Sequence, residues 1–351
     1  MEGLTHPRDL AAWHRWQHRQ QPSGRRAQQM FGVLRDIARP DGHAGSAVLA
    51  RGGPAPRVLV CLESRSPSSV QALLDPVRHL DPADVAVIAP TGVTDLLPEG
   101  SWTESTGFAP DLVGSHAAGG AVVLSTGHYL PLGALAHRSA EPGRFLTVQH
   151  GLLTPHAPPL GAGTILLAWS EADAAFWRSG RDDVGSVVVG SQLLWEAAEA
   201  PAASLDPDAR PVFLGQLHGA ELPRDVLADA AETFCRAEHA TYRPHPSERD
   251  RKSVATHARW EASGIDIDRS GTPLRELGAP VVSVFSTGVL EAAAAGLPAW
   301  VTLADPPTWL AELWERYGLE PWGGPPTASP ERPEVEPSRG VAEVVREMMA
   351  G

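Results

Sequence analysis

A stretch near the end of the chain, residues 281–301, constrains the fold more than any other part of the sequence. It begins with VVSVF, a short apolar and β-branched run that is typical of a buried parallel strand. Ser286, Thr287 and Gly288 form a small turn, and VLEAAAA then favours a helix that Gly296 ends. The following PAWV reads as the next strand. The turn therefore joins the carboxyl end of a strand to the amino end of a helix, where open α/β sheets bind ligands.

This turn is a candidate anion site. The first N–H groups of a helix favour a negative charge, and Ser286 and Thr287 add two hydroxyl groups beside the Gly288 backbone. Glu291 follows within the helix and supplies a carboxylate that suits sugar or ribose hydroxyls. The alternative is a core helix whose first turn is simply capped by Ser286.

Length and composition indicate a globular protein of two domains. The 351 residues are enough for two cores of ordinary size. A net charge of −13 argues against binding to nucleic acid by the whole chain. The only cysteines, Cys61 and Cys235, are too far apart to suggest a disulfide scaffold or a zinc cluster, so we expect a cytoplasmic protein. No run approaches 18 apolar residues, and the amino terminus does not read as a signal peptide.

The first 45 residues differ from the rest of the chain. Residues 1–40 hold seven arginines against three acids, a net +4 within a chain of −13. Two helices separated by Pro22-Ser23-Gly24 are predicted here. A basic helix that carries Trp13 and Trp16 can rest on an anionic membrane surface, which would place the protein peripherally at the inner membrane face. The more common alternative is that its apolar stripe packs on its own domain.

Strands and helices alternate from residue 57 to residue 192, after a Gly/Pro-rich segment, residues 41–56, that reads as a loop. This alternation implies a parallel, doubly wound sheet with right-handed crossovers. Short buried strands are predicted at 57–64, 84–90, 121–127, 144–151, 164–170 and 186–192.

A second α/β series follows a Pro-rich linker, and the closing helix could pack back on the first domain. The fold class is therefore α/β, with two doubly wound Rossmann-like domains facing across a cleft, and that cleft is the expected ligand site. The predicted parts are a basic helical segment (1–45), a first Rossmann-like domain (46–200), a linker (201–211), a second domain (212–320), and a Pro-rich connection with a final helix (321–351).

The segment Gln149-His150-Gly151 ends a predicted strand of the first domain, with His156 close behind. A histidine at this position can face a ligand, and its near-neutral pKa suits a general base that removes a hydroxyl proton. We expect Gln149 and His156 to lie on the acceptor side. A loop histidine bonded to backbone is the alternative reading of His150.

Arg243-Pro244-His245-Pro246 ends a predicted strand of the second domain. Two prolines fix the backbone on either side of His245, which suits an imidazole that must be aimed at a phosphate oxygen. Arg243 adds a permanent charge. A helix predicted from Ser247 would favour an anion at its first turn. The alternative is a rigid turn with an ordinary surface histidine.

Gln216 belongs to a weaker candidate, the loop GQLHG after the first strand of the second domain, because Gly-rich loops at this position approach phosphates closely. Metal binding fits poorly, since the sequence has no HExxH motif and no pair of closely spaced cysteines. The absence of GxSxG weakens an acyl hydrolase. We therefore expect neither a metal nor a cofactor.

RPHPSE, followed about forty residues later by VFSTGVLEAAAAGLPAWV, resembles the HP and Ser/Thr motifs of GT-B fold transferases. These include bacterial sialyltransferases, Kdo transferases and CDP-glycerol glycerophosphotransferases, and UDP-N-acetylglucosamine 2-epimerases share the general plan. TVQHG is similar to the His-Gly segment of the glycerophosphotransferases, with Gln149 where those enzymes have Trp. The Asp-Asp-Gly or Asp-Glu-Gly motif of the sialyltransferases is missing from this sequence.

The resemblance implies that His245, Ser286 and Thr287 contact the donor phosphates, that Glu291 holds the donor ribose and that His150 is the base. The implied function is a metal-independent glycosyltransferase that uses a nucleotide-sugar donor, CMP- or CDP-linked rather than UDP-linked. Its acceptor would be a hydroxyl of a glycan, a lipid-linked molecule or a small molecule, in surface polysaccharide or metabolite glycosylation. The alternatives are a CDP-glycerol-type polyol-phosphate transferase, a UDP-sugar 2-epimerase and a non-catalytic binding protein.

Overall fold

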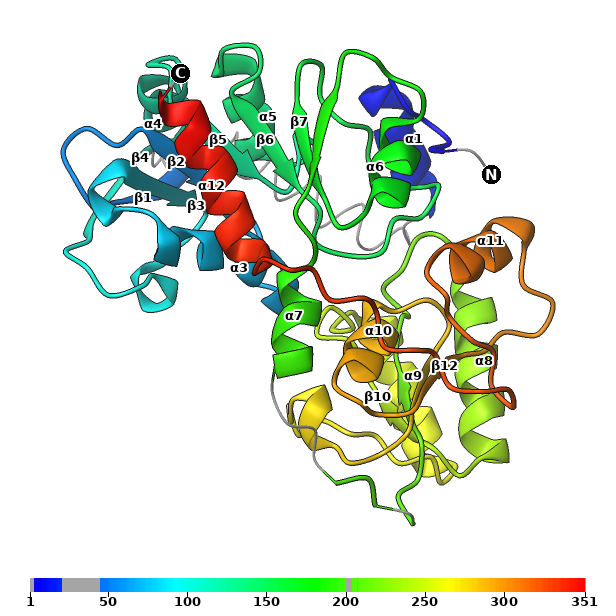
Figure 1. Ribbon diagram of the computed structural model, residues 1–351. Coiled ribbons are helices and arrows are strands. Elements are labelled where there is room, and N and C mark those ends of the chain that lie inside the picture. Colours follow the sequence, from blue (N-terminus) through cyan, green and yellow to red (C-terminus); the bar gives the residue numbers. More distant parts are fainter. Residues whose placement is uncertain (1–2, 21–44, 200–203, 207, 351) are drawn as a thin grey trace.

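The computed structural model describes residues 3–20, 45–199, 204–206 and 208–350. They form two α/β domains, one above the other in Figure 1. The first holds an eight-stranded sheet and the second a four-stranded sheet. The prediction of two Rossmann-like domains is confirmed, with one difference: the first sheet is mixed, not wholly parallel.

The first sheet has the strand order β4-β1-β3-β2-β5-β6-β7-β8. The six neighbouring strands β3, β2, β5, β6, β7 and β8 run parallel to one another. At the other edge, β1 is antiparallel to both β3 and β4. The strands are β1 (Ser46–Arg51), β2 (Val58–Cys61), β3 (Val85–Ala89), β4 (Thr103–Phe108), β5 (Val122–Ser125), β6 (Phe145–Val148), β7 (Ile165–Ala168) and β8 (Gly185–Val188).

Helices cover both faces of this sheet, as a doubly wound fold requires. On one face Leu73 and Leu74 of α3 (Pro67–Leu74) share a core with β2, β3 and β5. On the other face α4 (Ala109–Ala117) and α5 (Pro131–Ser139) pack over the same strands. The Ser66 hydroxyl caps α3 by accepting from the Ser69 N–H. Three short 3-10 turns (Asp75–His79, Pro82–Asp84 and Thr94–Leu96) and α6 (Glu171–Arg178) complete the domain.

The antiparallel edge corrects the prediction for residues 41–56. Within this supposed loop, Ser46–Arg51 form β1, which pairs with β3 over four residues. Its partner β4 was not predicted either. Every residue of β4 is exposed or half-exposed, so it carries no apolar pattern, and pairing with β1 holds it at the edge of the sheet.

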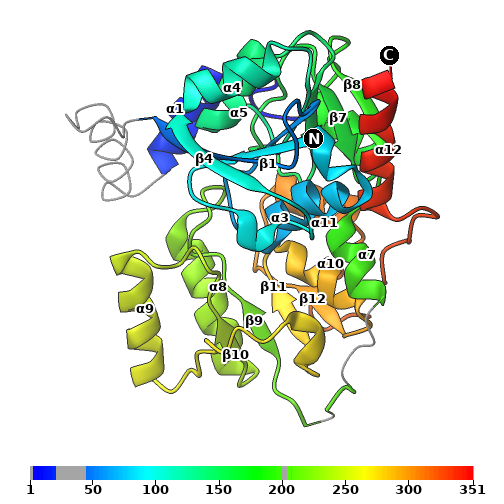
Figure 2. The same ribbon diagram turned by 90° about the vertical axis from the view of Figure 1, so that its left-hand side faces the viewer.

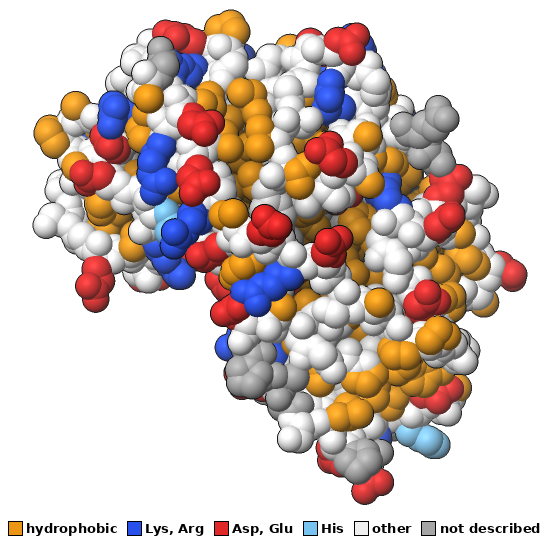
Figure 3. Space-filling model, in the orientation of Figure 1, with side chains coloured by type: hydrophobic (Ala, Val, Ile, Leu, Met, Phe, Trp, Pro, Cys, Tyr) orange, Lys and Arg blue, Asp and Glu red, His pale blue; other side chains and the backbone are white. Residues whose placement is uncertain are grey.

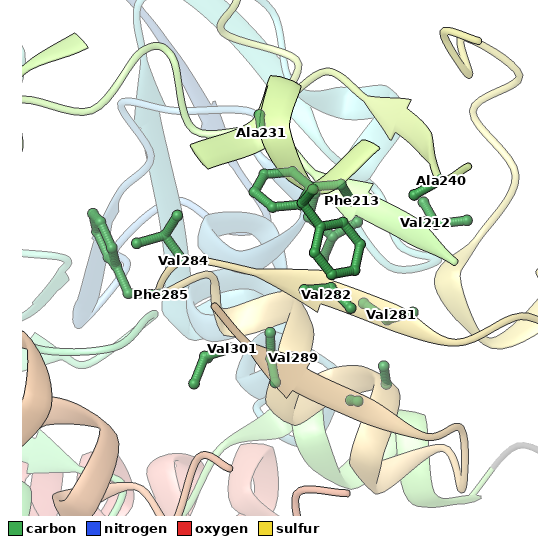
Figure 4. Close-up of a cluster of buried hydrophobic side chains, with 14 of the residues drawn as sticks. Val212, Phe213, Ala231, Ala240, Val281, Val282, Val284, Phe285, Val289 and Val301 are labelled. Atoms are coloured by element: carbon green, nitrogen blue, oxygen red, sulfur yellow. The ribbon is translucent and has the colours of Figure 1, made fainter. Parts of the chain in front are cut away.

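The second sheet is wholly parallel, in the order β10-β9-β11-β12. Figure 4 shows its core, where Phe213 lies over Val281 and Val282 while Phe285 stands apart. Ile267 adds a single bridge to Tyr242 at the edge of this sheet. The elements are β9 (Val212–Leu214), α8 (Arg224–Ala237), β10 (Thr241–Arg243), α9 (Arg251–Ala262), a 3-10 turn (Leu274–Glu276), β11 (Val281–Ser283), α10 (Thr287–Ala294), β12 (Ala299–Val301) and α11 (Thr308–Arg316).

Two helices tie the domains together. An unpredicted helix, α7 (Gln192–Glu199), lies against both α3 and α10 (Figure 1). The last helix, α12 (Pro337–Ala350), crosses back and buries Val341 and Val345 in the first domain. Among the residues that the structure places, no helix is both long and apolar enough to span a bilayer.

Candidate functional site

Each sheet has one switch point, where successive strands begin to be added on the opposite side of the first parallel strand. In the first sheet β2 pairs with β3 on one side and β5 on the other, and in the second sheet β9 pairs with β10 and β11 in the same way. Ligands of open α/β sheets bind at the carboxyl end of such switch points. The stretch that begins at Val281 therefore lies at the switch point of the second sheet.

Two predicted segments from different domains meet here. The Leu152 N–H, next to Gly151, donates a hydrogen bond of 3.2 Å to Oγ1 of Thr287, the first residue of α10. One residue further, the Leu153 N–H donates to the Tyr317 hydroxyl at 2.9 Å. The His-Gly segment of the first domain therefore lies against the Ser-Thr-Gly turn of the second.

The Ser286-Thr287-Gly288 turn is held by its own polar groups. The Ser286 hydroxyl caps α10 by accepting from the Gly288 N–H at 3.1 Å. Gly288 is required by packing, since a Cβ at this position would lie 2.6 Å from Leu214 Cδ1. A phosphate-binding role for Gly288 stays a prediction, and its N–H has a partner within the turn.

Arg243 and Glu291 lie close enough to interact. The Arg243 guanidinium forms an ion pair with Asp268 at 3.4 Å and donates to the Thr272 carbonyl. Burial raises the pKa of Glu291, and the charges of Arg243 and Arg275 act against that shift. The half-buried Glu291 carboxylate therefore faces two cations, and the Arg243 charge is already shared among acids of its own domain.

The His245 ring is exposed, and one of its nitrogens has a fixed role. Nδ1 accepts a hydrogen bond of 3.1 Å from the Ser247 N–H. Burial of part of the ring, together with the nearby His218, lowers the pKa of His245 to about 4. At neutral pH the ring is thus uncharged, and its proton must lie on Nε2. The rings of His218 and His245 stack, with centroids 3.8 Å apart.

Glu248 holds this histidine loop and was not predicted to do so. It is 4% exposed, and its Oε1 accepts from the backbone N–H groups of Leu217 at 3.0 Å and His245 at 3.3 Å. Its Oε2 accepts from the Tyr242 hydroxyl at 2.9 Å and meets His257 Nε2 at 2.9 Å. The only signal in the sequence is an acid three residues after the histidine in PHPSE.

The helix predicted from Ser247 begins later. The structure starts α9 at Arg251, and the Asp250 carboxylate caps it by accepting from Lys252 and Ser253. Ser247 and Glu248 lie before it in the loop that Glu248 organises. The Asp250 carboxylate caps α9, so the first N–H groups of this helix already have an acidic partner.

The GQLHG loop serves the packing of the second domain. A Cβ on Gly215 would come within 2.3 Å of the Tyr242 hydroxyl and 2.7 Å of Glu248 Oε1. Gln216 Oε1 accepts from Phe285 N at 3.0 Å and Ser283 Oγ at 3.1 Å. Gln216 therefore joins the ends of β9 and β11, and Gly215 leaves room for the Tyr242–Glu248 pair.

His150 keeps one nitrogen without a partner. Its Nδ1 is buried and makes no hydrogen bond among the described residues. Burial lowers the pKa of His150, while a backbone hydrogen bond with Val148 opposes the shift. The imidazole is therefore neutral at pH 7 and can accept a proton.

Gln149 does not offer its side chain to an acceptor, contrary to expectation. It is 1% exposed, and its amide bonds to the Asp173 carboxylate at 3.0 Å and the Trp169 N–H at 2.9 Å. The same Asp173 accepts from the Tyr317 hydroxyl. Gln149 thus braces the His-Gly segment toward the second domain.

His156 lies between the amino-terminal helix and the second domain. Its ring stacks on Trp16 of α1 (Leu10–Gln20) at 4.5 Å and meets the edge of Trp309 at 5.7 Å. Trp13, 4% exposed, donates from its indole to the His156 carbonyl at 2.7 Å. The tryptophans of α1 thus pack on their own domain, as in the alternative to membrane contact. The second helix predicted within residues 1–40 lies outside the described residues.

A pocket of about 990 Å³ lies between the domains, and none of the predicted site residues lines it. Its walls come from the ends of β7 and β8, from α10 and from α12, and Figure 3 shows apolar side chains gathered beside α12. Its lining includes Trp169, Trp195, Leu290 and Tyr317. Figure 2, turned by 90° from Figure 1, shows α7 at the junction of the two domains.

Within the described part of the chain, no group of three or more acidic, histidine or cysteine side chains is placed to hold a metal ion. Comparison with family models and with curated proteins finds no match.

Solved structures give distant matches. Anabaena Alr3699/HepE in complex with UDP and glucose is 14% identical, with a TM-score of 0.44, over 84% of this chain and 90% of that chain. A mutant O-GlcNAc transferase from Thermobaculum terrenum is 14% identical, with a TM-score of 0.40, over 85% of this chain and 63% of that one. A glycosyltransferase from Rickettsia africae ESF-5 is 9% identical, with a TM-score of 0.40, over 84% and 88%. Likeness at this level assigns neither an activity nor a substrate to this chain.

Proposed function

We propose that the protein is a glycosyltransferase that moves a sugar from a nucleotide donor to a hydroxyl group of an acceptor. One observation carries the proposal: the hydrogen bond from Leu152 to Thr287 brings the His-Gly segment of one domain to the switch point of the other. A transferase needs a proton acceptor and a leaving-group site at one place, and these two segments supply both.

On the donor side, the exposed His245 donates from Nε2 to a phosphate oxygen, and the Ser286–Thr287 turn contributes the amino end of α10. Arg243 contributes positive charge nearby, and Glu291 receives the donor ribose. The motif resemblance favours a cytidine nucleotide, with a uridine nucleotide as the alternative.

In the reaction, the acceptor oxygen forms a bond to the anomeric carbon of the sugar. The bond from that carbon to the donor phosphate oxygen breaks, and its electron pair leaves on the phosphate. The acceptor proton passes to His150, whose lowered pKa keeps it unprotonated before the step.

The test is His150→Ala, assayed with nucleotide-sugar donors and a hydroxyl acceptor. We expect kcat to fall by about 10²- to 10⁴-fold with donor affinity unchanged, because the base acts on the acceptor. His116→Ala on α4 is the matched control, since this ring bonds to Leu112 and Ser115 of its own helix. A His150→Ala enzyme that keeps the wild-type kcat would remove His150 from the mechanism.

A further inference from the structure

The two sheets share one arrangement of four parallel strands. The order β3-β2-β5-β6 in the first sheet matches β10-β9-β11-β12 in the second. In the first sheet the chain passes from β2 through α3 to β3, and β5 later pairs on the other side of β2. In the second sheet it passes from β9 through α8 to β10, and β11 later pairs on the other side of β9. Thus β2 corresponds to β9, and β5 and α5 correspond to β11 and α10.

Two residues after β2 and β9, the two domains differ by a charge. Cys61 ends β2 and Glu63 follows, whereas Leu214 ends β9 and Gln216 follows. The side chains are the same length, and both reach across the switch point to the neighbouring strand–helix unit. The difference lies in what each presents there.

Glu63 fills the amino end of α5. Its Oε1 accepts from the Leu132 N–H at 2.7 Å, and its Oε2 accepts from the Gly133 N–H at 2.9 Å. Both donors belong to the first turn of α5. A carboxylate therefore already occupies the place where a helix of this kind would receive an anion.

Gln216 leaves the corresponding end neutral. Its Oε1 accepts from Phe285 N at 3.0 Å, just before α10. Because an N–H can only donate, the atom facing it is the amide oxygen and not the nitrogen. Within the described first turn of α10 there is no acidic side chain, and its cap is the uncharged Ser286 hydroxyl.

We propose that Glu63 and Gln216 divide the substrates by charge between the two domains. The Glu63 carboxylate repels anions from the first switch point, so that domain takes an acceptor with no negative charge near its hydroxyl. The neutral Gln216 leaves the second switch point open to the donor phosphates. The inference rests on the proposed function and names the residues that determine which ligand each domain accepts.

The direct test is Gln216→Glu. A glutamate has the size of glutamine and can accept the same hydrogen bonds from Phe285 and Ser283, so the fold is retained. It adds a negative charge beside the α10 turn. We expect the Kd of the best-binding nucleoside diphosphate, CDP or UDP, to rise at least about tenfold, while the Kd of the matching uncharged nucleoside stays the same.

The matched control is Ala258→Glu on the exposed face of α9, which adds the same charge to the same domain. Its diphosphate affinity should stay within about twofold of wild type. Gln216→Glu binding the diphosphate as tightly as Ala258→Glu would overturn the assignment, and so would an equal loss for the nucleoside.

Glu63→Ala tests the first domain. Removing the carboxylate leaves the first turn of α5 without its anion, so the melting temperature of the variant should fall. Inorganic phosphate should restore part of the lost melting temperature by binding where the carboxylate was. The same phosphate should stabilise the wild-type protein less. A variant that gains no more from phosphate than wild type would contradict the proposed role of Glu63.

The wild-type titration separates this inference from the function beneath it. Wild-type protein that binds no nucleoside diphosphate would remove the proposed function and this inference together. Wild-type binding with an unaffected Gln216→Glu variant would remove only the inference.

Discussion

The switch points of the two domains are built on the same four strands, yet one is closed by its own side chains and the other is open. In the first domain, a carboxylate spans the start of α5, and the Gln149 amide after β6 is buried and hydrogen-bonded to Asp173 and Trp169. In the second domain, the exposed His245 and the hydroxyls of Ser286 and Thr287 lie at the corresponding edge. Strand order places both sites, and a few residues after the strands decide what each can hold.

The two carboxylates in these regions also differ in their solvation. Burial raises the pKa of Glu63, and its two backbone hydrogen bonds oppose that shift only in part. Burial acts on Glu248 in the same direction, but hydrogen bonds from His218, His257 and Tyr242 outweigh it and lower the pKa of Glu248 to about 2. The fold therefore favours the ionised form of Glu248, whereas burial opposes ionisation of Glu63.

The largest effect is expected from Glu248→Gln, which removes this charge from the second site. A folded pKa of about 2 against an ordinary 4.5 corresponds to about 3 kcal/mol of stability at pH 7. Because the folded pKa is depressed, this stability is present above about pH 4.5 and is lost as pH falls toward 2. The free energy of unfolding, measured in urea at pH 7, 4 and 3, should converge for the two proteins as pH falls.

Glu63→Gln is the control in the first domain. Because burial raises the pKa of Glu63, the folded state favours its protonated form. Lowering the pH should therefore not reduce the difference in free energy of unfolding between wild type and Glu63→Gln. Parallel pH curves for wild type and Glu248→Gln would show that the ionised Glu248 is not what stabilises the histidine loop.

A smaller effect is expected from Thr287→Val, which loosens the link between the two sites. Valine has the shape of threonine but cannot accept from the Leu152 N–H. Both residues are half-buried, so we expect a loss of about 1 kcal/mol in the free energy of unfolding, measured in urea. Thr287→Ser keeps the hydroxyl and is the control. A loss as large in Thr287→Ser as in Thr287→Val would mean that packing, and not this hydrogen bond, joins the domains.

The sequence was most informative where one local pattern carries the structure. The run from Val281 to Val301 folds as predicted, with Ser286 capping α10 and β12 following it. The alternation of strands and helices gave both sheets, since short apolar runs without a polar face are buried on both sides. The position of polar residues at strand ends predicted that the His-Gly segment and the Ser-Thr-Gly turn lie together, because the carboxyl ends of parallel strands share one edge of a sheet.

Elements held mainly by distant partners were missed. β4 has no apolar pattern and depends on β1, and α7 begins at Gln192, soon after β8 ends at Val188, and packs on helices of both domains. Glu63 and Glu248 are single acids in loops, and their partners become visible only in the fold. The Leu132 N–H that Glu63 receives lies 69 residues away in the chain, so only the sheet order reveals the contact.

The central claim is that the second switch point binds the phosphates of a nucleotide donor. The most direct test is thermal stabilisation of wild type and His245→Ala by CMP, CDP, UDP, GDP and ADP. A ligand at 100 times its Kd adds about 2.7 kcal/mol, which is visible as a rise in melting temperature. We predict selective stabilisation of wild type by a cytidine or uridine nucleotide and a much smaller rise for His245→Ala. Folded wild-type protein that responds to none of the five, or a His245→Ala variant that responds equally, would contradict the claim.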